Sequence, residues 1–154
     1  MARFRKIYLL LFAVIAFAIP GQLNAQQDLQ ISKVFDRYGK KKGAVMVQLT
    51  KEMLKEYDFS FFKSVVIKNN PAAIDFAREC IAKDQEGAKK IKQVVQNGEM
   101  TSVVLQLAPR GDENRLILYN ESTGEKREMT LIYIESKMDA ERIMTMILRK
   151  NKGV

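Results

Sequence analysis

The stretch KKIKQVVQNGEMTSVVLQL, residues 89–107, decides whether the middle of this chain forms helices or a sheet. Its Asn97-Gly98 pair is the strongest short-range signal for a β-hairpin, because both residues tolerate the positive φ angles of a tight turn. Residues 101–107 are rich in β-branched and apolar side chains, as strands are. The apolar residues before the turn also fit helical spacing, which leaves a continued helix as the alternative. We predict that 89–96 is a strand that pairs with 101–107.

Four further strands are predicted on the two sides of this hairpin. Each segment combines β-branched and apolar residues and is bounded by turn or capping residues. Two precede the hairpin and two follow it: Ala44–Leu49, Phe62–Ile67, Arg115–Asn120 and Glu128–Glu135. Because consecutive strands joined by short turns run antiparallel, the late strands indicate one largely antiparallel sheet of five to six strands.

Three longer helices and one short helix are predicted from apolar spacing and capping residues. The first helix lies within residues 28–38 and ends at Gly39. The starts of the others are marked by Thr50 for the short helix, Asn70-Pro71 for the next, and a capping box from Ser136 to Asp139 for the last. The predicted order is therefore helix, strand, short helix, strand, helix, consecutive strands and a final helix.

A single domain, residues 26–154, can bury the apolar faces of these elements. Each longer helix has one apolar stripe, which must be packed against the sheet. We expect the three helices to cover the apolar face of the sheet, which makes an α+β two-layer sandwich. Cys80 is the only cysteine, so no intramolecular disulfide can form, and its apolar neighbours predict a buried side chain.

The N-terminus has the pattern of a secretory signal peptide, residues 1–25. Basic residues precede the unbroken apolar run of residues 7–19, which is shorter than the roughly 20 residues that a membrane-spanning helix needs. Pro20-Gly21 then breaks the helix, and cleavage is expected between Ala25 and Gln26. A retained anchor is the alternative, because leucine stands where a small residue is preferred near the cleavage site. Cleavage implies a periplasmic or secreted protein.

Three segments carry a resemblance to a known family: GAVMVQLTKEML (43–54), FKSVVI (62–67) and MTLIYIESKMDAERIMTMI (129–147). The first is a strand that runs into a turn of helix, and the last is a strand that leads into an acid-capped helix. Together they resemble small exported domains of unknown function, found mainly in Bacteroidetes-type bacteria. The resemblance spans most of the chain after the leader. It implies export across the inner membrane and no assigned activity, and it implies no functional residues.

The composition excludes several classes of chemistry. The chain has no histidine, which removes the commonest general base and metal ligand, and with it Ser-His-Asp and Cys-His arrangements. It also lacks the glycine-rich motifs of nucleotide-binding loops. We therefore predict no catalytic residue, no metal site and no cofactor. A hydrolase that uses carboxylates alone is an alternative, although the acidic pairs Glu52/Glu56, Asp75/Glu79 and Asp139/Glu141 fit solvated helix faces.

Six lysines form two clusters that are candidates for anionic-surface binding: Lys40, Lys41 and Lys42, and then Lys89, Lys90 and Lys92. If the fold gathers them on one face, they can bind phosphate-rich lipid or polysaccharide. No aromatic residues stand among them as base-stacking platforms, so we predict no nucleic-acid binding. Solvated charge without a ligand is the alternative, and any membrane contact is peripheral.

Tyr57, Phe59 and Phe61 alternate in the stretch YDFSFF, residues 57–62. They either close one end of the core or present an aromatic edge to a partner. Our leading hypothesis is a non-enzymatic exported binding or adaptor module that recognises an envelope protein through these rings. An anionic lipid or polysaccharide binder is the second hypothesis, and the carboxylate-only hydrolase is the third. The sequence indicates no oligomeric state.

Overall fold

The computed structural model describes residues 28–122 and 124–151, which contain four helices and six strands. The predicted leader and its cleavage site at Ala25 and Gln26 lie outside the described residues. In chain order the elements are α2 (Ser32–Tyr38), β1 (Ala44–Gln48), α3 (Lys51–Glu56), β2 (Phe61–Lys68), α4 (Pro71–Gln85), β3 (Ala88–Gln96), β4 (Glu99–Arg110), β5 (Glu113–Glu121), β6 (Glu128–Ser136) and α5 (Ala140–Asn151). Their order agrees with the prediction. Within the described ranges, no helix is both long and apolar enough to cross a membrane.

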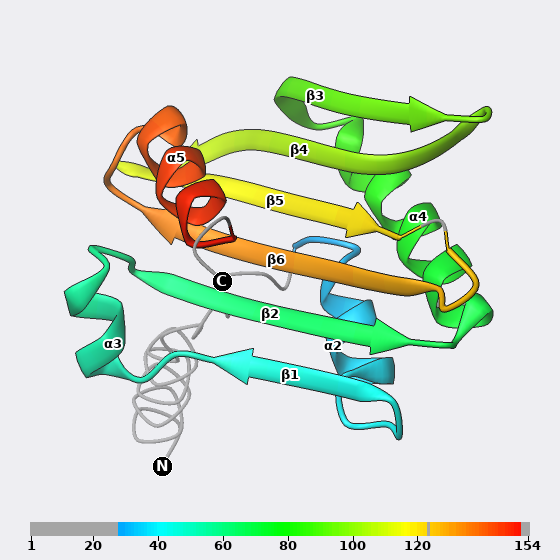
Figure 1. Cartoon of the computed structure of the whole chain (residues 1–154). Coiled ribbons are helices and arrows are strands. Elements are labelled where there is room, and N and C mark those ends of the chain that lie inside the picture. Colours follow the sequence, from blue (N-terminus) through cyan, green and yellow to red (C-terminus); the bar gives the residue numbers. More distant parts are fainter. Residues whose placement is uncertain (1–27, 123, 152–154) are drawn as a thin grey trace, which may run out of the picture.

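The six strands form one antiparallel sheet in the order β1-β2-β6-β5-β4-β3 (Figure 1). β5 and β6 lie near the middle, where Leu118 pairs with Ile132, and Ile132 pairs on its other side with Ser64 of β2. β1 and β3 are the two edges. The predicted α+β class, with one antiparallel sheet covered by helices, is confirmed.

The hairpin that the sequence signals is present. Asn97 and Gly98 have φ angles of 52° and 80°, and Gln96 pairs with Glu99 across the turn. Ala88–Gln96 is therefore a strand, and the alternative of a continued helix is wrong. Positive φ at both central residues gives the turn a twist that matches the right-handed twist of the flanking strands.

The capping signals act as predicted at two helices and differently at the third. Thr50 and Asn70 cap α3 and α4 through side-chain hydrogen bonds to the backbone. At α5, Asp139 is the cap, since its Oδ1 accepts the N–H of the residue three positions later at 2.9 Å. Ser136 is instead the buried last residue of β6, and its hydroxyl donates to the carbonyl oxygen of Asp58 at 2.7 Å.

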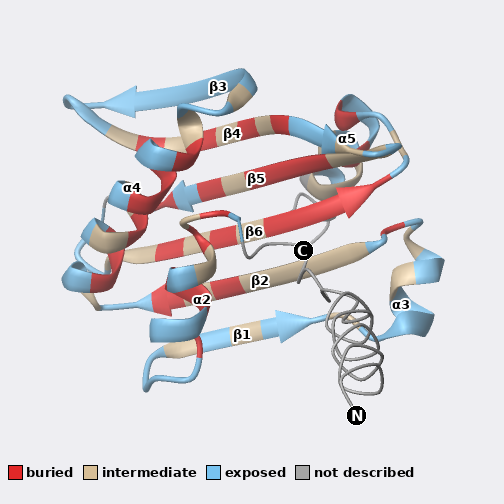
Figure 2. Cartoon of the chain, turned by 180° about the vertical axis from the view of Figure 1, so that it is seen from behind, coloured by how far each residue is buried: buried red, intermediate tan, exposed pale blue. Residues whose placement is uncertain are grey.

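Helices cover both faces of the sheet. α2 and α4 lie on one face (Figure 2), and α5 lies on the other (Figure 1). The larger core, beneath α2 and α4, contains among others Phe35, Ile74, Ile81, Leu105, Ile117 and Leu131, together with Cys80, which is buried as predicted. The smaller core beneath α5 consists of Phe59, Leu116, Ile134, Ala140 and Ile143. The sequence analysis assigns all three longer helices to one face, whereas the structure divides them because β5 and β6 are apolar on both faces.

α5 covers only part of its face, over the central strands at one end of the sheet (Figure 1). The edge strands therefore leave apolar side chains open to solvent on this side, where Val45 is 62% exposed and Val47 is 44% exposed. Their neighbours Ala44 and Met46 point the other way and pack against the larger core. This alternation follows from the two-residue period of a strand.

The segment before α2 is attached to α4 by Asp84. Its carboxylate accepts hydrogen bonds from the backbone N–H groups of Gln30 at 2.8 Å and Ile31 at 2.9 Å. Burial raises the pKa of Asp84 above its ordinary value, although these two hydrogen bonds act in the opposite direction.

Gly39 follows α2 as the sequence predicts, but for a different reason than a left-handed cap. Its φ is −60°, which any residue can adopt. A Cβ at this position would lie 2.5 Å from the Phe35 carbonyl oxygen and 2.6 Å from the Met46 sulfur. Glycine is needed here because a Cβ would collide with the backbone of the last turn of α2, and the Met46 side chain of β1 closes the space beside it.

We expect Gly39→Ala to lower the free energy of unfolding by about 1–3 kcal/mol, because the added methyl group overpacks this contact. Gly87→Ala is the matched control, since a Cβ there has no neighbour closer than 3.9 Å. Its effect should stay within about 0.5 kcal/mol. Urea unfolding of both variants measures the difference, and equal losses would contradict the interpretation.

Candidate functional site

An open groove of about 220 Å³ lies on the α5 face of the sheet, between α3 and α5. We call it the apolar groove, and it is lined by Leu49, Met53, Tyr57, Phe59, Phe62, Ile132, Met146 and Ile147. These residues come from α3 and the loops flanking it, β2, β6 and α5. Only Tyr57 among them carries a polar side-chain group.

Three aromatic rings form one wall of the apolar groove. The ring centroids of Tyr57 and Phe59 are 5.9 Å apart, and those of Phe59 and Phe62 are 6.0 Å apart, both in stacked orientations. Asp58, with a φ of 56°, turns the chain sharply after α3. This left-handed residue brings Phe59 back under the helix, where its N–H donates to the carbonyl oxygen of Leu54 at 2.9 Å.

The structure separates the three aromatic residues that the sequence groups together. Tyr57 and Phe59 line the apolar groove, whereas Phe61 lies on the opposite face of the sheet, 5.8 Å from the ring of Tyr133. Phe62 occupies the third position in the groove instead. The two-residue period holds only within a strand, and β2 begins at Phe61, after the turn at Asp58.

The two lysine clusters lie at opposite edges of the sheet. Lys40, Lys41 and Lys42 precede β1, while Lys89, Lys90 and Lys92 belong to β3 (Figure 1). All six are exposed. Four strands separate the two edges, so the clusters do not share one binding surface.

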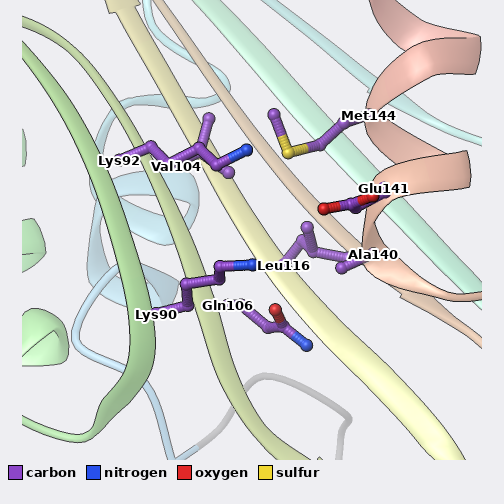
Figure 3. Close-up of a pocket in the computed structure, with 8 residues that line it drawn as sticks. All are labelled: Lys90, Lys92, Val104, Gln106, Leu116, Ala140, Glu141 and Met144. Carbon is purple, nitrogen blue, oxygen red and sulfur yellow. The ribbon is translucent and has the colours of Figure 1, made fainter.

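Lys90 and Lys92 extend from β3 across β4 toward α5, as Figure 3 shows. They line a small hollow of about 20 Å³ together with Val104, Leu116, Met144 and other residues of β4 and α5. Glu141 is the one carboxylate in this lining. Within the described part of the chain, neither lysine forms an ion pair.

Two clusters of buried ionisable side chains lie at opposite ends of β5 and β6. Each begins with a tyrosine followed two residues later by a glutamate, Tyr119 and Glu121 on β5 and Tyr133 and Glu135 on β6. In both pairs the tyrosine hydroxyl donates to the glutamate. Burial raises the pKa of both tyrosines far above the ordinary value, and the hydrogen bond to the neighbouring glutamate adds to the shift.

Arginines neutralise the first cluster. The side chain of Glu121 is 2% exposed and accepts hydrogen bonds from Arg78 at 2.9 and 3.0 Å and from Arg127 at 2.8 Å. Burial alone would raise the pKa of Glu121, but the hydrogen bonds from Arg127, Tyr119 and Arg78 outweigh it and lower the pKa below its ordinary value. The carboxylate is therefore held ionised, in a structural ion pair.

The second cluster joins the first described residue to the sheet. Arg115 donates to the Tyr133 hydroxyl at 3.1 Å and forms an ion pair with Asp28 at 3.0 Å. Arg110 pairs with Asp28 at 2.9 Å and approaches Glu135 at 3.5 Å. The N-terminal segment is thus attached to the ends of β4, β5 and β6.

Sequence reasoning missed both clusters, although a signal was present. Tyr119 and Glu121 share the core-facing side of β5, as Tyr133 and Glu135 share that of β6, so each glutamate occupies a position that alternation marks as buried. A buried charge needs a partner. The acidic pairs that the sequence did single out, Glu52/Glu56, Asp75/Glu79 and Asp139/Glu141, are all exposed. No group of three or more metal-ligating side chains occurs in the described residues.

We expect Glu121→Gln to destabilise the fold by about 2–3 kcal/mol near neutral pH, because the charge-assisted hydrogen bonds from Arg78 and Arg127 are weakened or lost. Since folding lowers the pKa of Glu121, the parent chain holds this stabilisation above the ordinary pKa of 4.5 and loses it as the pH falls through the folded value. The variant should therefore show a shallower acid-induced loss. Urea unfolding across this pH range measures both effects.

Glu99→Gln is the control for this variant, because Glu99 also contacts Arg78 but its side chain is 61% exposed. It should change stability by less than about 1 kcal/mol. If the two variants behave alike, the buried ion pair is not what stabilises this end of the sheet.

The sequence matches a family of unknown function, DUF6108, over residues 18–147. No curated protein and no solved structure gives a significant match. The matched region includes all six strands and most of α5. The chain therefore belongs to the DUF6108 family.

Proposed function

We propose that this protein is a non-enzymatic binding module that takes up an apolar segment of a partner protein in the apolar groove. The observation that carries the proposal is an open groove walled by stacked aromatic rings, whose lining residues offer no carboxylate, amine or thiol. Apolar surface left open in this way commonly marks an interaction site. Aromatic residues are also the side chains that most often dominate binding energy at protein interfaces.

The size of the apolar groove favours a protein over a small molecule as its occupant. Its volume of about 220 Å³ is below the roughly 300–1,000 Å³ of most small-molecule sites. A cleft of this size suits one anchoring side chain of a partner and its immediate neighbours. Met53 and Met146 lie at its walls, and their flexible thioethers adapt readily to different apolar shapes.

The apolar surface continues beyond the groove along β1. Val45 and Val47 share the α5 face of β1, and Leu49, just after the strand, lines the groove on the same face. A partner anchored in the groove can extend over these exposed valines and bury more area than the groove itself offers.

The proposed compartment is the periplasm or the exterior, and the proposed partner is an envelope protein. The basic start, the short apolar run of residues 7–19 and the small residues before Gln26 support export by a cleaved leader. Membership of a family of unknown function is compatible with this role and assigns no other.

The alternative functions receive less support. An anionic lipid or polysaccharide surface would meet only one of the two lysine clusters at a time, because they lie at opposite edges of the sheet. For a carboxylate hydrolase, the buried carboxylates of the described residues are already engaged: Glu121 and Glu135 by tyrosine and arginine side chains, and Asp84 by two backbone N–H groups.

If the leader is cleaved on export, the protein isolated from its own host has a lower mass than the full chain. Cleavage by signal peptidase should leave a chain that begins at Gln26, which intact-mass analysis of the envelope fraction detects. A chain that retains Met1 would overturn cleavage in favour of the retained anchor, and one that also faces the cytosol would overturn the assignment of compartment; neither result bears on the apolar groove.

Met53→Asp should weaken binding of an envelope partner by about tenfold or more, because it places a charge in the apolar groove. Ala72→Asp is the control, since Ala72 is also exposed but belongs to α4, which lies on the opposite face of the sheet and in neither proposed binding surface. Capture from the native envelope at high salt, followed by affinity measurement with the identified partner, gives the comparison. If both variants bind the partner as the parent chain does, the groove is not the binding site.

A further inference from the structure

β3 is an open edge of the sheet. Its one neighbour among the described strands is β4, so alternate backbone N–H and C=O groups on its other side have no strand to pair with. From Lys89 to Gln96 every side chain is exposed, on both faces of the strand. At nine residues it is also longer than β1, the five-residue strand at the opposite edge. A long, uncovered edge of this kind is a template for an added strand.

The side chains of β3 combine apolar and basic character. Ile91, Val94 and Val95 are 43%, 51% and 52% exposed. Residues 88–96 also contain three lysines and no acidic residue. Apolar side chains favour the addition of a strand, whereas edge lysines oppose the addition of an uncharged or basic strand and leave an acidic strand as the favourable partner.

The register of β3 assigns these side chains to faces. Lys92 pairs with Val104 of β4, and Lys90 stands two residues before it, so both belong to the α5 face, as Figure 3 also shows. Ile91 pairs with Leu105, a residue of the larger core, and therefore lies on the α4 face. An added strand thus meets two lysines on one face and an isoleucine between them on the other.

We propose that β3 takes up an extended acidic segment of a partner protein as a seventh strand of the sheet. Two carboxylates of this segment, two residues apart, lie opposite Lys90 and Lys92, and the apolar residue between them packs against Ile91. Side chains directly opposite each other in neighbouring strands are about 4.5–5.5 Å apart at Cβ, within reach of a lysine–carboxylate pair. In the free chain Lys90 and Lys92 extend over β4, but both are exposed and no ion pair among the described residues holds them there, so they can turn toward the added strand. The site is separate from the apolar groove and needs no residue of it.

A second copy of this chain fits the edge less well. In the antiparallel register that overlaps all of 88–96, Lys92 lies directly opposite Lys92 of the other copy. Like charges in directly opposite positions destabilise a strand pair. Charge complementarity therefore favours an acidic strand over self-association.

The test uses fluorescently labelled, end-blocked nine-residue peptides and the purified chain. A peptide with two glutamates flanking one valine should bind, and its glutamine counterpart should bind about tenfold more weakly because two cross-strand ion pairs are lost. The same peptide with N-methylated backbone amides on alternate residues should not bind, since strand addition requires its backbone donors. Fluorescence polarisation measures the affinities, and protection of the amides of 88–96 from hydrogen exchange locates the site.

The double variant Lys90→Glu, Lys92→Glu should lose binding of the acidic peptide, whereas Lys40→Glu, Lys41→Glu should retain it. Both variants change the net charge equally and replace exposed lysines, so the comparison removes the effect of overall charge. Met53→Asp should also retain peptide binding, which keeps this result independent of the apolar groove. Equal binding to both double variants, or undiminished binding of the N-methylated peptide, would overturn the proposal. A dimer in sedimentation that dissociates on Lys90→Glu, Lys92→Glu would also overturn it, by showing a second copy at the edge.

Discussion

β5 and β6 are packed on both faces of the sheet, and this double burial constrains the arrangement of the other elements. Ile117 and Leu131 face α2 and α4, while Leu116 and Ile134 face α5. A strand pair that is apolar on both sides has to be covered on both sides, so the helices divide between the two faces. α2 and α4 pack on the larger core, and α5 packs on the smaller core.

The buried polar clusters follow from the same pair of strands. Where β5 and β6 reach the ends of the core, each carries a tyrosine and a glutamate on its buried face, and arginines from α4, β4, β5 and the β5–β6 connection neutralise them. A buried carboxylate without such a partner would be costly. These contacts also fix neighbouring segments, because Arg115 holds Asp28 and Arg78 connects α4 to β5.

Unequal covering of the sheet leaves two surfaces of different chemistry. Between α3 and α5 the apolar groove is open and almost uncharged, which suits an anchoring apolar side chain. At the far edge, β3 presents backbone groups, valines and lysines, which suits an extended acidic segment. β5 and β4 lie between the two surfaces, so a partner bound at one of them leaves the other open. Two such surfaces support the binding role that we propose.

The sequence by itself determined the order of the elements, the α+β class and the hairpin at Asn97-Gly98, because spacing, capping and turn chemistry are local properties. Tertiary structure alone decided which side chains meet. The grouping of Tyr57 and Phe59 with Phe62 depends on the left-handed turn at Asp58, and no periodic pattern in the sequence predicts that turn. The separation of the two lysine clusters depends on strand order. One cluster precedes β1 and the other lies on β3, and the fold places these two strands at opposite edges of the sheet. The requirement for glycine at Gly39 arises from the Phe35 carbonyl oxygen at the end of α2 and from the Met46 side chain of β1, and only the packed fold brings the second of these into contact.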